Sequence, residues 1–334
     1  MNEADGIDSL LKILKEIPAV GPGRARAYQV LLVLFRVANK RALYRPDPWT
    51  AALGCPSTEA VQHMVDHGFL CKAPIQVVIE SRSRKELLDM LQERRLPVTG
   101  NKVVCAARLI TADPSSMQAI ADRDELLLCT DIGRTVAEHF LEEELSFKRD
   151  AHATALTAIE AGNYLEAVEQ AQSVLARRVV GGGDDLFGLY PERCVSIITR
   201  IMAARPTLLR DLPEPSWEPL RLAASMDSIF QDKAETWIPA GTPAHPRLSH
   251  DACCRMLLFS ASQSFNLSVF RASDYVRAVK LLTGPDLCEA CSRDDQIEYS
   301  LDDVPELPHA ECTCKIGCPC GMVAVVSKSG TTSL

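Results

Sequence analysis

The feature that most constrains the fold is the segment 82–110, which predicts two short amphipathic helices joined by a proline-containing link. Ser83 can cap the first helix, and Glu86, three positions later, completes a capping box. Three leucines then fall on one apolar face: Leu87, Leu88 and Leu91. Pro97 favours extended backbone in the link, and a second helix is expected at 101–110. The segment therefore predicts a compact helix–turn–helix module.

The same segment resembles a SAP domain nearly end to end, from Arg84 to Leu88 and again from Leu96 to Lys102. It departs from the family pattern after Lys102, where Val103 and Val104 replace an acidic residue and a leucine. The resemblance implies binding to the DNA backbone, often with a preference for A·T-rich minor grooves. The candidate DNA-binding residues here are Arg84, Lys85, Arg94, Arg95, Gly100, Asn101, Lys102 and Arg108.

Lys102 would lie at a helix N-terminus, where free backbone N–H groups favour a phosphate oxygen. RNA or a protein is the alternative ligand of such a module. A plain helical hairpin with a solvated basic face is the alternative interpretation of the segment itself.

The flanks of the module suggest short strands, before it at 67–70 and after it at 126–129. The second flank continues through Thr130 to Gly133 and resembles the Leu-Thr-x-x-Gly turn that ends many winged-helix repeats. This resemblance implies that the module is inserted in a winged-helix frame.

A second basic segment near the N-terminus has an amphipathic helix at 10–16 and a Gly/Pro-rich turn after it. The pattern at 10–26 resembles a helix-hairpin-helix motif, with Ala19 where the first glycine is expected. The resemblance points to four candidate phosphate-binding residues: Gly21, Gly23, Arg24 and Arg26. A simple turn between two helices is the alternative.

The net charge of −8 hides a strong segregation of charge. Residues 12–45 hold eight Lys or Arg and one acid, a local charge of +7, and residues 82–110 hold a local +4. Residues 284–320 hold nine acids and two Lys or Arg, a local −7. Because phosphate binding depends on the field within a Debye length, both basic segments could bind nucleic acid.

Six of the thirteen cysteines lie between Cys288 and Cys320, and they predict a zinc site. A C-x₂-C pair at Cys288 and Cys291 would be joined by His309 and by either Cys312 or Cys314. Four protein ligands leave no open position, so the metal would be structural. The other seven cysteines are expected in apolar cores.

The same segment also resembles the C-terminal motif of phage head-morphogenesis (minor head) proteins. The resemblance lies in the order of the C-x₂-C pair, then Leu307-Pro308-His309, then Cys312-Thr313-Cys314. The family usually has a glycine after the first pair, where this chain has Gln296 and Ile297. The resemblance implies a bacterial or prophage setting. The acidic charge of the cluster favours folding or docking of a protein partner over DNA contact.

The chain as a whole is expected to be mostly α-helical, with several small modules and the Cys-rich terminus. We expect four domains: 1–48, helical with the hairpin motif; 49–148, the SAP-like module and its flanks; 149–283, a helical middle domain; and 284–334, the zinc-binding terminus. Within the middle domain, 151–178 predicts a helical hairpin.

No nucleotide-binding, metalloprotease or esterase motif occurs in the sequence. The sequence therefore favours a non-enzymatic, cytoplasmic DNA-binding adaptor, which contacts duplex DNA largely without sequence preference and docks a partner through its C-terminal half. A phage- or prophage-derived assembly protein is the alternative. The acidic start without an apolar segment argues against a secretory signal, and no apolar stretch is long enough to span a membrane.

Overall fold

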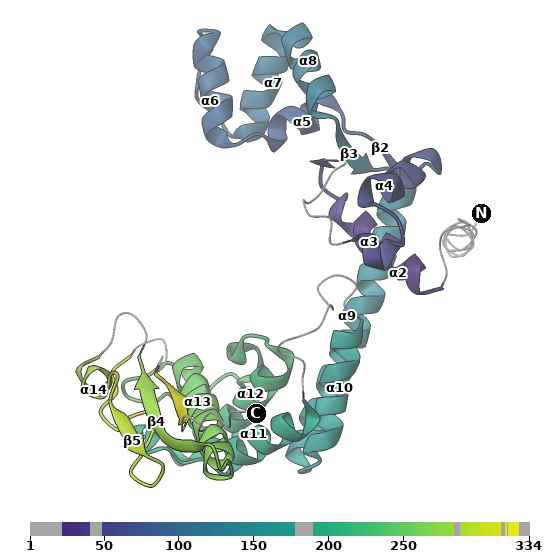
Figure 1. Ribbon diagram of the computed structural model, residues 1–334. Coiled ribbons are helices and arrows are strands. Elements are labelled where there is room, and N and C mark those ends of the chain that lie inside the picture. Colours follow the sequence, from purple (N-terminus) through teal and green to yellow (C-terminus); the bar gives the residue numbers. More distant parts are fainter. Residues whose placement is uncertain are drawn as a thin grey trace, which may run out of the picture. The chain divides into compact units, whose positions relative to one another are not determined.

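The computed structural model describes residues 22–40, 49–177, 190–283, 288–314, 318 and 320–326 (Figure 1). It is mostly helical, as the sequence predicts, with two small antiparallel sheets. The chain divides into two compact units. The first comprises residues up to 148 together with 176–185, and the second comprises 149–175 and the residues from 186 onward.

The first unit contains a frame of helices and one three-stranded sheet. In chain order its elements are α2 (Pro22–Leu34), β1 (Asn39–Lys40), α3 (Thr50–Leu53), α4 (Ser57–Asp66), β2 (Leu70–Lys72), β3 (Leu126–Cys129) and the start of α9 (Asp131–Glu160). The strand order is β1-β3-β2, all antiparallel. The core of the frame is apolar and includes Tyr28, Leu31, Phe35, Val61, Met64, Phe69 and Leu127.

A threonine–glycine turn fastens the start of α9 to the end of α4. Thr130 donates its hydroxyl to the carbonyl of Gly68 at 2.7 Å, and the same oxygen accepts a hydrogen bond from the Gly133 N–H at 3.1 Å. A Cβ on Gly133 would lie 3.0 Å from the carbonyl carbon of Phe69 and closer still to its oxygen. Glycine is therefore needed here because the Phe69 backbone fills the space of a side chain.

The predicted helix–turn–helix forms, but as part of a four-helix module. Its helices are α5 (Ile75–Ser81), α6 (Arg84–Glu93), α7 (Lys102–Ala112) and α8 (Pro114–Asp124). They share one core: Ile79, Leu87, Leu91, Cys105, Ala106, Leu109 and Met117. The whole module is inserted between β2 and β3, whose residues Lys72 and Leu127 pair directly.

The capping box at the start of α6 is present as expected. The backbone N–H of Glu86 donates to Ser83 Oγ at 3.2 Å, and the Ser83 N–H donates to the Glu86 carboxylate at 2.8 Å. In α7 the Asn101 side chain accepts a hydrogen bond from the Val104 N–H at 3.0 Å. Both helices thus begin where a local side chain accepts one of the free N–H groups of the first turn.

The second unit packs helices around α13. Its helical elements after α9 are α10 (Tyr164–Ala176), α11 (Pro191–Ala203), η1 (Thr207–Leu209), η2 (Glu214–Ser216), α12 (Trp217–Phe230), η3 (Ala234–Trp237), α13 (His250–Arg271) and α14 (Glu289–Ser292). The predicted hairpin corresponds to the end of α9 and α10, which meet at Gly162 in a left-handed conformation. Ala155, Ile159 and Val168 pack within it.

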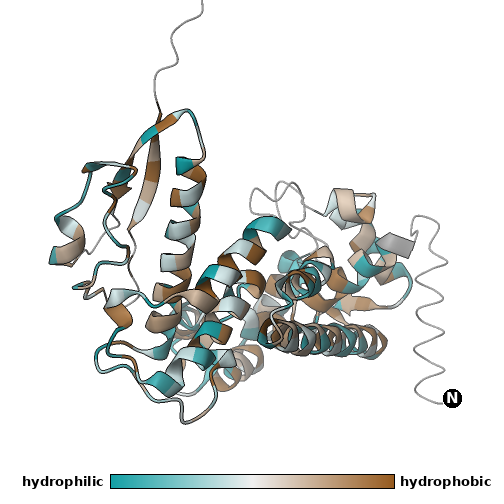
Figure 2. Cartoon of the chain, turned by 90° about the horizontal axis from the view of Figure 1, so that it is seen from below, coloured by the Kyte–Doolittle hydropathy of each residue, from teal (hydrophilic) through white to brown (hydrophobic). Residues whose placement is uncertain are grey.

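The second sheet has the order β5-β4-β6, with β4 (Val276–Leu282) pairing antiparallel with both β5 (Glu298–Ser300) and β6 (Gly321–Val326). Along the long helices, hydrophilic residues interrupt the hydrophobic ones (Figure 2), and none of the described helices is long and apolar enough to cross a membrane.

Cysteines outside the C-terminal cluster are mostly in cores. Cys55, Cys105, Cys129, Cys253 and Cys254 are buried, whereas Cys194 is half-buried. Cys71 is exposed, because it lies on the outer face of the edge strand β2. The expectation that all seven are core residues is therefore wrong for Cys71.

Candidate metal centre and basic module

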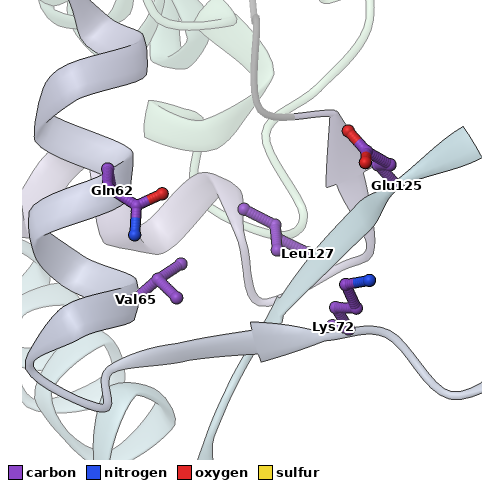
Figure 3. A pocket seen from close by; sticks show the side chains of 5 residues that line it. All are labelled: Gln62, Val65, Lys72, Glu125 and Leu127. Atoms are coloured by element: carbon purple, nitrogen blue, oxygen red, sulfur yellow. The ribbon is translucent and has the colours of Figure 1, made fainter.

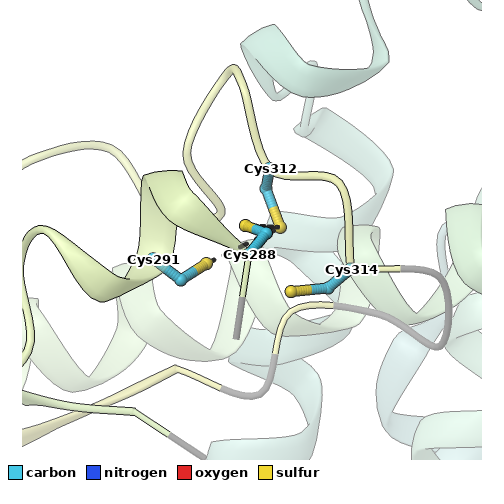
Figure 4. A group of neighbouring side chains, drawn as sticks. All are labelled: Cys288, Cys291, Cys312 and Cys314. Carbon is cyan, nitrogen blue, oxygen red and sulfur yellow. Dashed lines mark hydrogen bonds between the residues drawn. The ribbon is translucent and has the colours of Figure 1, made fainter. Parts of the chain in front are cut away.

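Six cysteines converge beside the second sheet. Cys288 caps α14, Cys291 lies within it, and the loop after β5 supplies Cys312 and Cys314 (Figure 4). Their four sulfur atoms all lie within 4.8 Å of one another. Cys291 also belongs to a second group of sulfurs within that distance, completed by Cys318 and Cys320.

The sulfur spacings match those of a tetrahedral metal site. Cys288 and Cys291 lie 3.9 and 3.7 Å from Cys312, and Cys291 lies 3.6 Å from Cys318. A Zn–S bond of about 2.3 Å in a tetrahedron places neighbouring sulfurs about 3.8 Å apart. The thiols are therefore spaced so that one ion could contact four of them.

Backbone N–H groups reach several sulfurs of the cluster, but the pKa is lowered only for Cys288 and is raised for Cys291, Cys312, Cys314 and Cys318. Burial opposes ionisation of Cys288, but hydrogen bonds from the N–H groups of Thr313 and Cys291 bring its pKa down to about 6. Burial raises the pKa of Cys314 to about 11, against a hydrogen bond from the Cys288 N–H. Such N–H donors stabilise thiolates, and a bound metal requires thiolates.

His309 is not brought into the sulfur cluster. Its Nε2 lies 3.2 Å from Asp294 Oδ2, and its carbonyl accepts the Cys312 N–H at 3.0 Å. The groups of potential ligands among the described residues contain cysteines alone. Of the five ligands expected from the sequence, the structure thus brings together Cys288, Cys291, Cys312 and Cys314.

The sequence leaves open which of the four distal cysteines bind a metal, and the ligands named from it do not include Cys318 and Cys320; both are buried with the others. Their signal was visible in the C-x-C spacing directly before β6. Cys318 also contacts α13, because its backbone N–H donates a hydrogen bond to Met256 Sδ at 3.3 Å.

The cysteine cluster is continuous with the helical core of the second unit. Five of its cysteines are buried in one cluster with residues of α12 and α13, including Leu220, Ala224, Cys253 and Leu257. The Cys-rich terminus thus shares its core with the helices before it. A metal there would stabilise this core, which fits a structural role.

The basic module presents four of its cations on the surface. Arg84 and Lys85 lie in the first turn of α6, Arg95 follows α6, and Lys102 opens α7; all four are exposed. None of them forms an ion pair with another residue that the structure describes. Gly100, directly before the cap of α7, has a φ of +115°.

Two other candidate cations of the module have structural partners. Arg94 Nε donates to Asp113 Oδ2 at 3.0 Å, joining the end of α6 to the start of α8. Arg108 donates to the carbonyl of Thr99 at 2.9 Å and to that of Pro97, and so holds the link between α6 and α7. These two arginines therefore stabilise the arrangement of the helices within the module.

The candidate helix-hairpin-helix motif is described only in part. Gly21 and the turn before it lie outside the described residues, and Gly23 falls within α2. Arg26 pairs with Glu144 and donates to the carbonyl of Arg177 at 3.0 Å. Arg24 is exposed, and its guanidinium lies against Gly54, where it would meet any added Cβ.

A small pocket lies between α4 and the sheet of the first unit (Figure 3). Gln62 and Val65 line it from α4, and Lys72, Glu125 and Leu127 line it from β2 and the start of β3. The described lining residues include one acid, Glu125, and one lysine, Lys72, but neither cysteine nor histidine.

Comparisons with protein-family models, with curated proteins and with solved structures find no match to this chain.

Proposed function

We propose that this chain is a non-enzymatic DNA-binding adaptor that holds duplex DNA through the phosphate backbone. The contact surface is the exposed basic side of the SAP-like module, centred on Lys102. The observation that carries the proposal is the position of Lys102, exposed in the first turn of α7, where free N–H groups and the helix dipole favour an anion.

The difference between the basic residues that have partners inside the module and those that do not supports this assignment. Arg94 and Arg108 are held by partners inside the module, whereas Arg84, Lys85, Arg95 and Lys102 extend into solvent. Cations that serve no internal contact can neutralise phosphates without loss of a structural bond. Phosphate contacts of this kind position a protein on DNA without reading its sequence.

The frame that carries the module supports a winged-helix assignment. Helix, strand, two helices and two strands follow one another, and the strand order is β1-β3-β2, the order expected of a winged-helix domain. In that fold α4 would be the recognition helix and β2–β3 the wing. Here α4 carries Glu59 and Asp66 and neither lysine nor arginine, so phosphates would be repelled from α4 and contact the inserted module.

The acidic C-terminal segment is proposed to dock a protein partner. Among its described residues seven acids are exposed: Glu289, Asp295, Glu298, Asp302, Asp303, Glu306 and Glu311. Their negative field excludes DNA and would attract a basic protein surface.

We infer that the metal of the cysteine cluster is zinc with a structural role. Thiolates are soft ligands that select zinc over hard cations such as magnesium or calcium. Four sulfurs around one ion leave no open position for a substrate.

The DNA-binding proposal is tested by measuring the salt dependence of binding. Fluorescence anisotropy of the full chain with a labelled duplex gives the affinity at several KCl concentrations. Each phosphate contact contributes about −0.9 to the slope of log affinity against log salt. We expect Lys102→Glu to weaken binding to all duplexes alike and to flatten the slope by roughly one or two units.

Lys233→Glu is the matched control, because it makes the same charge change at an exposed lysine of the second unit. It should leave affinity and slope unchanged. A folded Lys102→Glu protein with unchanged affinity and slope would refute the assignment of the module. Stable homo-oligomers of the natural chain without DNA affinity would point to an assembly role.

A further inference from the structure

The cysteine cluster contains more sulfur than one zinc ion can bind. A tetrahedral zinc site takes four ligands, whereas the sulfurs of six cysteines converge here. A single ion bound by Cys288, Cys291, Cys312 and Cys314 would leave Cys318 and Cys320 as spectators within the core.

The distances between sulfur atoms do not set Cys318 and Cys320 apart from the other four cysteines. The Cys291–Cys318 separation of 3.6 Å is shorter than the Cys288–Cys312 separation of 3.9 Å within the first group. Cys318 also exchanges a hydrogen bond with Cys312, so it contacts both Cys291 and Cys312. The two groups of sulfurs share Cys291, and Cys312, which lies 3.7 Å from Cys291, contacts Cys318 of the second group.

We propose that the six cysteines hold two zinc ions side by side, with Cys291 and Cys312 bridging both. Cys288 and Cys314 then bind only the first ion, and Cys318 and Cys320 bind only the second. Each ion has four sulfur ligands, and the two tetrahedra share one edge. This inference rests on the proposed identity of the metal as zinc and goes beyond a single structural site.

The backbone around the second group resembles that around the first. The Cys320 N–H donates to the sulfur of Cys318, as the N–H groups of Thr313 and Cys291 donate to Cys288.

The test is the zinc content of the full chain, purified without chelator, incubated with excess zinc and desalted. Native mass spectrometry and elemental analysis should give about two zinc ions per chain, as two closed four-ligand sites require. Cys318→Ser and Cys288→Ser should each lower the content to about one. Cys194→Ser, a half-buried cysteine on α11 outside the cluster, is the matched control and should retain two.

X-ray absorption at the zinc edge of the natural chain tests the bridge without a variant. Two ions joined by sulfur give a metal–metal scattering shell, which isolated sites lack. One zinc per chain, unaffected by Cys318→Ser, would overturn the inference and leave the structural zinc intact. Two zinc ions without the metal–metal shell would overturn the bridge, and a chain without zinc would overturn both proposals.

Discussion

Replacing Gly133 with alanine tests how the first unit is held together. The added Cβ would lie 3.0 Å from the carbonyl carbon and 3.3 Å from the Cα of Phe69. Both atoms belong to backbone, and a rotamer change cannot move them. Phe69 or the first turn of α9 must therefore shift.

The magnitude follows from the bonds that such a shift strains. The Phe69 carbonyl accepts the Thr130 N–H at 3.0 Å and the Thr130 hydroxyl at 3.2 Å. Overpacking costs about 1–3 kcal/mol, and each weakened hydrogen bond about 1 kcal/mol. We expect a local loss of about 3 kcal/mol, which corresponds to about two orders of magnitude in an equilibrium constant.

The assay is native-state hydrogen exchange of the full chain, read in peptides that cover β3 and the first turns of α9. Protection of the Thr130 amide should fall about a hundredfold. Gly162→Ala is the matched control, since its φ of +78° is strained but nothing lies within 4 Å of an added Cβ. That variant should leave β3 unaffected. Equal protection of Thr130 in Gly133→Ala and the natural chain would refute the packing argument.

Two further predictions concern pH and metal. Hydrogen bonds from Ser116 and then Arg94 hold the pKa of Asp113 below its ordinary value of 3.8. The stability that they add is present above that value and is lost as the pH falls through the lower pKa of the folded state. Hydrogen exchange of α7 and α8 in acid should therefore depend less on pH in Asp113→Asn, and an unchanged profile would count against this coupling. Removing metal with a chelator should expose Trp217, which is buried in the same core as the cysteines, and lower protection of α12. Protection of α7, in the other unit, should be unchanged, and loss there as well would contradict separate cores.

Features determined by neighbouring residues could be predicted from the sequence. The capping box of Ser83 and Glu86 spans three positions, and its two hydrogen bonds form as expected. The threonine and glycine of the turn after β3 also lie three positions apart, and they hold the start of α9. These hydrogen bonds join residues within one helical turn, so the pattern alone specifies them, whereas the bonds from Thr130 to Gly68 and Phe69 depend on the fold.

Features determined by distant residues could not be predicted in this way. Arg94 is a residue type that often contacts DNA, yet it donates a hydrogen bond to Asp113. That partner lies nineteen residues later, beyond the predicted end of the module. His309 has the spacing of a metal ligand, but Asp294 occupies its Nε2. Cys318 is held by Met256 from α13, sixty-two residues earlier. Residue types and spacing predict the chemistry of a site, whereas tertiary packing decides which members contribute.

The insertion of the four-helix module between two paired strands has a consequence for how this chain can change. Lys72 and Leu127 are direct neighbours across the ladder, and the Ala73 N–H still donates to the Leu126 carbonyl at 2.8 Å. The module therefore leaves and re-enters the frame at almost one point, as a hairpin turn does. Because the module has its own core, the frame only has to keep the two ends of the insertion, which are neighbours across the ladder, in place. We expect insertions, deletions or whole exchanges at this point to be tolerated as long as the new segment folds by itself, so the inserted module could diversify while the scaffold stays constant.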